Sequence, residues 1–99
     1  MRTDAEINLA IANIEYQELV IGLVGDEVKI LTDPNDEIKF VDYCNNWEDI
    51  GPIIAREGIN VYRWRNHWTA VCPNENHHIF SETPMKAAAL CFLKMRESE

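Results

Sequence analysis

The chain has 99 residues, of which 46% are hydrophobic and 26% charged, and this composition is typical of one folded globular domain rather than of a disordered segment. The formal net charge of −8 is uneven, because residues 1–49 hold twelve acids and three bases and are near −9, whereas the second half is near +1. This balance disfavours direct binding to nucleic-acid phosphates and favours a partner with a basic surface.

Residues 4–15 are expected to form an amphipathic helix. Thr3 and Glu6 have the spacing of a capping box, in which each side chain bonds to the backbone amide of the other residue. Ile7, Ile11 and Ile14 then recur at helical spacing, which predicts one buried stripe along this helix.

Residues 18–31, ELVIGLVGDEVKIL, predict a β-hairpin. Gly25 and Asp26 form a two-residue turn of the kind that matches the twist of paired strands. This register places Leu23 opposite Val28 and Ile21 opposite Ile30, so that one face is apolar throughout, with Glu27 and Lys29 on the other face.

Residues 32–40 are expected to add a third strand to this hairpin as a meander. With Pro34–Asp36 as a three-residue loop, Ile38 lies opposite Thr32 and Phe40 opposite Ile30, on the same apolar face. A loop of two or four residues would turn both side chains to the other face, so the hydrophobic pattern favours three residues.

Residues 45–58 predict a turn followed by a short helix. We expect the turn over residues 45–50 and the helix over Pro52–Glu57, because proline is tolerated at the first helical position and clashes within a helix. Gly58 is then the C-terminal cap of this helix.

The segment VYRWRNHWTAVC, residues 61–72, predicts a second hairpin whose turn length is left open. With a two-residue turn, Trp64 and Trp68 fall on opposite faces and Arg63 shares the side of Trp68. With a three-residue turn over Arg65–His67, both tryptophans share one face and Arg63 lies on the other. The direction of Trp64 decides whether this stretch is available to a partner.

The C-terminal part predicts a short strand at HHIF, residues 77–80, and a last helix that begins at Thr83-Pro84, where a capping hydroxyl precedes proline at the first helical position. The expected fold class is therefore α+β. A small antiparallel sheet, made of a hairpin or meander and a C-terminal hairpin, would be covered by N- and C-terminal helices in a single domain over residues 1–99.

Three segments, YCNNWEDIGPIIAREGI, HWTA and ETPMKAAALCFLKM, resemble the NinX-like proteins of tailed bacteriophages and prophages. The positions that carry the resemblance are Cys44 and Asn45, Trp47, Gly51 to Ile54, Ile59, Trp68, Ala70, Pro84 and Ala87 to Ala89. It covers about residues 40–96, with AEINLAIA as a weaker echo, and leaves out residues 16–40. The resemblance implies a phage or prophage protein made in the bacterial cytoplasm, and it transfers no reaction and no catalytic residues.

Metal and thiol chemistry have weak support in the sequence. Three cysteines form an odd count without a close pair, which predicts reduced, buried thiols rather than a disulfide framework. A zinc site would need convergent ligands, and the only adjacent pair, His77 and His78, would point to opposite faces of a strand. The residues considered were His67, His77 and His78 with Cys44, Cys72 and Cys91. No catalytic, cofactor-binding or metal residue is assigned, and no cofactor is expected.

Two groups of residues are the candidates for binding a partner. Asp33, Asp36 and Glu37 form an acidic meander that could mimic the charge of nucleic acid toward a basic groove. Arg63, Trp64, Arg65 and His67 belong to the aromatic hairpin and include the residue types enriched at binding hot spots.

The function predicted from the sequence is that of a non-enzymatic phage accessory protein. It would bind a host or phage protein with a basic surface and inhibit or redirect host machinery, for example as an anti-CRISPR or anti-restriction factor. The alternative is a small-ligand or nucleotide-binding protein that uses the aromatic hairpin, and a metal-dependent enzyme is the third hypothesis. No apolar run approaches the roughly 18 residues of a membrane span, so no membrane is expected, and a homo-oligomer is left open.

Overall fold

The structure is a computed structural model that describes residues 2–31, 37–73 and 78–97. Its described helices are α1 (Asp4–Glu15), α2 (Trp47–Glu57) and α3 (Pro84–Glu97), with a short 3-10 helix, η1 (Gln17–Leu19), after α1. The described strands are β1 (Val20–Val24), β2 (Glu27–Leu31), β3 (Ile38–Val41), β4 (Asn60–Trp64), β5 (His67–Val71) and β6 (His78–Ser81).

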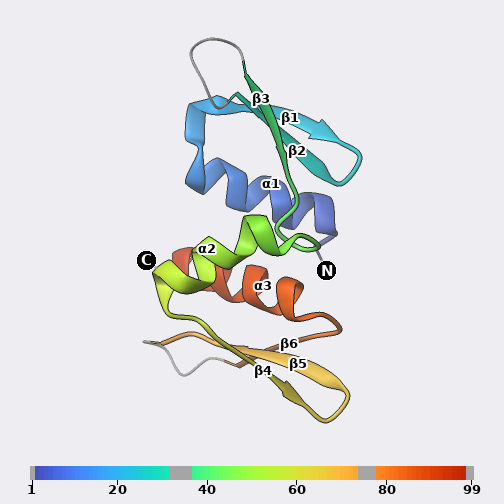
Figure 1. Cartoon of the computed structure of the whole chain (residues 1–99), viewed down its shortest axis with the longest axis vertical. Helices are drawn as coiled ribbons and strands as arrows, with labels where there is room; N and C mark the ends of the chain where they lie inside the picture. Colours follow the sequence, from blue (N-terminus) through green and yellow to red (C-terminus); the bar gives the residue numbers. More distant parts are fainter. Residues whose placement is uncertain (1, 32–36, 74–77, 98–99) are drawn as a thin grey trace.

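The strands form two antiparallel sheets with the helices between them (Figure 1). The β1-β2-β3 sheet lies on α1 at one end of a body that measures 45 × 26 × 23 Å, and the β4-β5-β6 sheet lies on α3 at the other end. One buried cluster contains residues of both sheets and all three helices. The α+β class with a helix near each terminus is confirmed, while the strands divide into two sheets whose outer faces point away from each other.

Both terminal helices begin where their capping residues predict. The Thr3 hydroxyl accepts a hydrogen bond from the Glu6 amide at 3.2 Å, and the Glu6 carboxylate accepts from the Thr3 amide at 3.4 Å. At the other end of the chain, the Thr83 hydroxyl accepts from the Lys86 amide at 3.2 Å, and Pro84 is the first residue of α3. Local side-chain chemistry is sufficient to define these two starts.

The predicted start of α2 at Pro52 is wrong, because the helix begins at Trp47 and contains Pro52 in its interior. Asn46 caps it, with a side-chain oxygen that accepts a first-turn amide at 3.0 Å. A proline disfavours a helical conformation of the residue before it, partly through a clash with that residue's Cβ. Gly51 has no Cβ, so this part of the clash is absent before Pro52. The predicted cap at Gly58 is confirmed, with a left-handed φ of 71°.

The first hairpin has the predicted turn but a different register beyond it. Leu23 lies opposite Val28 as predicted. The prediction that Ile21 lies opposite Ile30 is wrong, because Val20 is the partner of Ile30. The register shift between Val20 and Gly22 makes Ile21 the extra residue of a bulge, and its side chain is exposed.

The register predicted for β3 is also wrong, and its large hydrophobic side chains lie on the opposite face. Phe40 lies opposite Lys29 on the outer face, and Ile38 shares that face. Val41 is buried on the inner face. Because side chains alternate along a strand, Phe40 and Ile38, one and three positions before it, point outward. The three-residue loop predicted over Pro34–Asp36 lies outside the described residues.

A fully buried asparagine, Asn8, connects α1 to two other segments. Its Nδ2 donates to the backbone oxygen of Asp26 and to a carboxylate oxygen of Asp42, each at 2.8 Å. Its Oδ1 accepts from the Cys44 amide at 3.0 Å. The side chain thereby links α1 to the β1–β2 turn and to the segment that joins β3 to α2.

α3 is the helix that holds the two halves together. It contacts α1 and α2 on one side and all the strands of the β4-β5-β6 sheet on the other. Ala87, Ala88, Ala89 and Phe92 are fully buried in it. Within the described ranges, no helix has the length and apolar character needed to cross a bilayer.

Candidate interaction surface

The outer face of the β4-β5-β6 sheet carries a group of exposed aromatic side chains. Tyr62 pairs with Thr69, and Thr69 pairs with Phe80, so their side chains lie in one row across the sheet. Trp64 and His67 form a second pair on the same face. Trp64 is 53% exposed and Phe80 56%. We call Tyr62, Trp64, His67 and Phe80 the aromatic surface.

The turn between β4 and β5 has two residues, since Trp64 pairs with His67. Its first residue, Arg65, has a φ of 55°, the left-handed conformation that such hairpin turns require. Of the two alternatives that the sequence left open, the two-residue turn is therefore the one found. It places Trp68 and Arg63 on the inner side of the sheet and Trp64 on the outer side.

A groove lies between the aromatic rings. Its volume is about 240 Å³, and it is lined by Tyr62, Trp64, His78 and Phe80. The His67 ring meets Phe80 edge-on, with 6.4 Å between the ring centroids. A groove of this volume is smaller than the pockets that hold drug-sized ligands and suits one side chain or one planar ring.

Thr69 lies on the central strand between Tyr62 and Phe80, two of the residues that line this groove. Its side chain is fully buried, and its Oγ1 has no hydrogen-bond partner among the described residues. Leaving a buried hydroxyl without a partner costs about 1–3 kcal/mol. A ligand that inserted a polar group between the Tyr62 and Phe80 rings and hydrogen-bonded to the Thr69 Oγ1 would recover part of this free energy.

Cationic side chains border the aromatic surface. The Arg65 guanidinium lies over the Trp64 ring, 5.7 Å from the ring centroid. Arg63 is exposed beside the turn, and its Nε donates to the backbone oxygen of Arg65 at 3.4 Å. Of the four hairpin residues that the sequence singled out, Trp64, Arg65 and His67 thus lie together at the outer face, while Arg63 is on the inner side and contacts the turn.

Glu37, the one acidic candidate among the described residues, does not join this surface. Glu37 is exposed just before β3, in the other sheet, at the opposite end of the molecule (Figure 1). Asp33 and Asp36 lie outside the described residues. Of the acidic candidates, the described one, Glu37, therefore lies at the other sheet from the hairpin residues.

A larger cleft, of about 570 Å³, lies between the starts of α1 and α3 and the end of β6. Asp4 and Lys86 line it and form an ion pair of 2.9 Å, whose hydrogen bond lowers the pKa of Asp4 and raises the pKa of Lys86. Asn45 also donates to Asp4, at 3.3 Å. Because these charges are satisfied by each other, the cleft is a weaker candidate for binding than the aromatic surface. No local spacing in the sequence predicts it.

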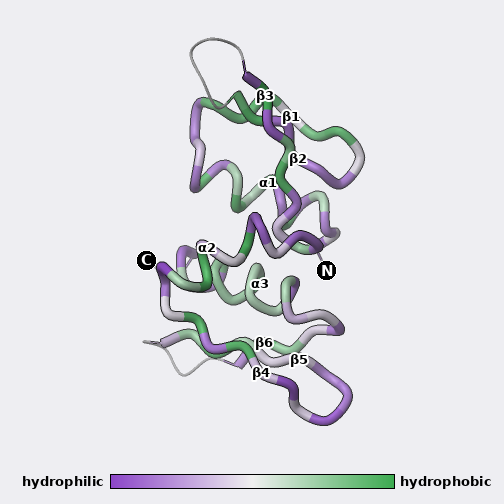
Figure 2. Tube along the Cα trace, in the orientation of Figure 1, coloured by the Kyte–Doolittle hydropathy of each residue, from purple (hydrophilic) through white to green (hydrophobic). Residues whose placement is uncertain are grey.

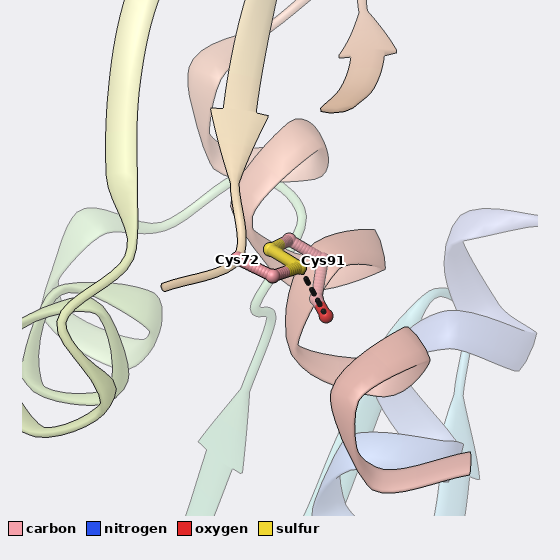
Figure 3. The surroundings of a disulfide bond; sticks show 2 residues. All are labelled: Cys72 and Cys91. Atoms are coloured by element: carbon pink, nitrogen blue, oxygen red, sulfur yellow. Dashed lines mark hydrogen bonds between the residues drawn. A yellow bond between two sulfur atoms is a disulfide. The ribbon is translucent and has the colours of Figure 1, made fainter. Parts of the chain in front are cut away.

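Cys72 and Cys91 form a disulfide that joins the end of β5 to α3 (Figure 3). Their Cα atoms are 6.1 Å apart. The prediction of reduced thiols is wrong for this pair. The two cysteines are 19 positions apart in the sequence, and only the packing of α3 on the sheet brings them together.

The remaining cysteine, Cys44, is free and buried. Burial raises the pKa of its thiol to about 12, and the nearby carboxylates of Asp4 and Asp42 contribute in the same direction. The thiol is therefore protonated at neutral pH and unsuited to nucleophilic attack. Among the described residues, which exclude His77, no three His, Cys, Asp or Glu side chains converge as a metal site.

Counting thiols checks the cysteine arrangement. Protein purified without reductant should show one reactive thiol per chain after unfolding, that of Cys44, and three after unfolding with reductant. The folded protein should react slowly with a thiol reagent, because Cys44 is 1% exposed. Three reactive thiols in the unfolded, unreduced protein would contradict the disulfide.

Comparison of the sequence with models of protein families gives a match over nearly the whole chain. A family model described as Bacteriophage P22, NinX matches residues 2–96 of the chain. The match contains both sheets and the aromatic surface, and it includes residues 16–40, which the sequence resemblance had left out. No curated protein matches the chain.

Proposed function

Because the chain belongs to the bacteriophage P22 NinX family, we propose that this phage accessory protein is not an enzyme and acts by binding another protein through the aromatic surface. The observation that carries the proposal is the outward placement of Tyr62, Trp64 and Phe80 on one sheet face, with Arg65 beside them. Tryptophan, tyrosine and arginine are the residues most enriched where binding energy is concentrated.

Exposure of these rings is better explained by binding than by folding. The inner face of the same sheet already supplies the buried contacts, through Ala70 and the partly buried Val61, Trp68 and Ile79. An outward strand position gains little stability from a large ring that is half in water, and contiguous apolar groups on a small protein mark interaction sites.

The proposed partner is a host or phage protein, and the proposed effect is inhibition or redirection of host machinery. Counter-defence, as an anti-CRISPR or anti-restriction factor, is the narrower form of this proposal. Its support is the phage family together with a net charge of −8, which can compete with nucleic acid for a basic groove. In this narrower form the aromatic surface would hold the partner, and the acidic meander of Asp33, Asp36 and Glu37 would compete for its basic groove. Charge reversal would then remove the competition and leave capture intact.

The state of the thiols argues against one kind of enzyme, a protein that uses a cysteine nucleophile. Cys44 is held protonated, and Cys72 and Cys91 are bonded to each other. We place the action of the protein in the cytoplasm of the bacterial host, where phage proteins are made. Disulfides are uncommon in a reducing cytoplasm, so the thiol count described above also tests this placement.

A second candidate function is the binding of a small ligand or nucleotide in the groove of the aromatic surface. The observation that favours it is the unpartnered Thr69 hydroxyl between Tyr62 and Phe80, which line a groove of about 240 Å³. A planar ring between Tyr62 and Phe80 would stack on their faces and accept or donate a hydrogen bond at Thr69. Thermal stabilisation by nucleotides that is lost in Thr69→Val would favour this function over protein binding.

Affinity capture from lysate of the bacterial host tests the protein-binding proposal. We expect the immobilised protein to retain a specific host or phage protein, Trp64→Ala to lose it, and the charge-reversed variant at Asp33, Asp36 and Glu37 to keep it. A partner that is lost on charge reversal and kept by Trp64→Ala would bind the acidic meander instead. If no protein is retained by the unaltered chain, the proposal fails.

A further inference from the structure

The outer face of the β1-β2-β3 sheet is a second exposed apolar surface, at the opposite end of the molecule from the aromatic surface (Figure 1). The register places Val24, Ile38 and Phe40 on it, with the half-buried Leu31 opposite Ile38. Val24 is 56% exposed and Phe40 46%. We call these four residues the apolar face.

The inner face of this sheet is already occupied, so the apolar face is not needed for the core. Val28, Ile30 and Val41 are buried on the inner side, which lies on α1. Figure 1 shows none of the described helices over the outer side, although hydrophobic stretches continue through these strands in Figure 2. A sheet with one solvated face normally carries polar residues there, as β2 does with Glu27 and Lys29, whereas β1 and β3 place Val24, Ile38 and Phe40 on this face.

Acidic residues surround the apolar face. The described part of residues 17–41 holds four acids and two bases, Lys29 and Lys39. Glu18, Asp26, Glu27 and Glu37 are exposed at the ends of the three strands. The charge of this end of the molecule is therefore opposite in sign to that of the hairpin that carries Arg63 and Arg65.

Gly22 leaves open space at the centre of the apolar face. It pairs with Lys29, which in turn lies opposite Phe40. A Cβ added at Gly22 would meet no atom within 4 Å, and the left-handed glycines of the described chain are Gly25 and Gly58. A side chain introduced at position 22 would therefore alter this surface without straining the backbone.

The geometry points to the apolar face as the docking site of a second protein whose contact surface is apolar at its centre and basic at its rim. Burial of Val24, Ile38 and Phe40 would supply the attraction, and the acidic residues around them would select a basic partner and speed its approach. A second copy of the chain is a poor occupant, because two acidic rims would then face each other. The inference goes beyond the proposed function, since it does not use the aromatic surface. With both surfaces occupied, the protein would connect two partners at its opposite ends.

Three synthetic peptides serve as probes, one with alternating Lys and Leu, one with alternating Glu and Leu, and one with alternating Lys and Ser. We expect the Lys–Leu peptide to shift the backbone NMR signals of Val24, Ile38 and Phe40, and to bind more weakly as salt is raised. The Glu–Leu peptide carries the same sign of charge as the acidic rim, and the Lys–Ser peptide lacks apolar side chains for the centre of the face. Each should therefore bind at least about tenfold more weakly than the Lys–Leu peptide.

A matched pair of variants, Gly22→Arg and Gly22→Glu, separates charge from bulk. Both add a long side chain to the same open position, and Gly22→Arg should melt slightly lower than Gly22→Glu, because position 22 lies opposite Lys29. Gly22→Arg should weaken binding of the Lys–Leu peptide at least about tenfold relative to Gly22→Glu, because it brings like charges together. The indole signal of Trp64 should stay in place throughout, since it reports on the other surface.

Three results would overturn the inference. One is equal binding of the Lys–Leu and Glu–Leu peptides, or of the Lys–Leu peptide to the two Gly22 variants. Another is a set of shifts on β4, β5 and β6 in place of β1, β2 and β3. The last is a concentration-dependent shift of the apolar face without peptide, which would identify a second copy as its occupant. None of these results bears on capture through Trp64, so the two proposals can fail separately.

Discussion

Replacing Asn8 with alanine should lower the free energy of unfolding by about 2–4 kcal/mol. The substitution removes three hydrogen bonds and leaves the Cys44 amide and the backbone oxygen of Asp26 without the partner they have now. The Cys44 amide stays buried, so its desolvation cost is not recovered. Against a total stability of about 5–15 kcal/mol for a domain of this size, the loss is large, and urea denaturation measures it.

Asn45→Ala is the matched control for Asn8. Asn45 belongs to the same polar network and donates to Asp42 at 3.1 Å and to Asp4 at 3.3 Å, but its side chain is exposed. Water can replace those bonds, and the expected loss is below about 1 kcal/mol. Similar losses of unfolding free energy for Asn8→Ala and Asn45→Ala would show that burial of Asn8 does not determine how much its hydrogen bonds contribute to stability.

Trp64→Ala should weaken binding of the captured partner by about 30-fold or more, which corresponds to a loss of about 2 kcal/mol. The side chain is 53% exposed in the free protein, so thermal stability should change little. Trp47→Ala is the control, because Trp47 is 50% exposed on α2, away from the aromatic surface. Titration calorimetry with the purified partner compares the three proteins, and equal losses for the two tryptophans would contradict the assignment.

Features set by neighbouring residues could be predicted from the sequence. The capping box of Thr3 and Glu6 and the hydroxyl cap at Thr83 define helix starts through contacts within one turn. The Gly58 cap and the two-residue turn after Val24 are equally local. In each case the chemistry that decides the conformation lies within a few positions of the residue it decides.

Features that depend on distant partners were not predicted correctly. The hydrophobic pattern gave no reason to place Phe40 outward, because the choice is made by Val41, which is buried between the sheet and α1. The early start of α2 depends on Asn46, and on Gly51 relieving the usual restriction before Pro52. The Cys72–Cys91 disulfide likewise requires the final packing of α3.

The candidate site was predicted in part. Trp64, Arg65 and His67 were identified from one segment, but Phe80 and Thr69 were not, because their place beside Tyr62 depends on the pairing of β6 with β5. The alternation of large rings at positions 62 and 64 is the signal that could have extended the site along β4. The separation of Glu37 from the hairpin follows from the division of the strands into two sheets, which the sequence pattern does not show.

The indole N–H signals of the three tryptophans give the most direct test of the aromatic surface as the binding site. Trp64 lies on that surface, Trp68 on the inner face of the same sheet, and Trp47 on α2. When the captured partner is added to isotope-labelled protein, the Trp64 signal should shift or broaden while the Trp47 signal stays in place. A shift of Trp47 with an unchanged Trp64 would contradict binding through the aromatic surface.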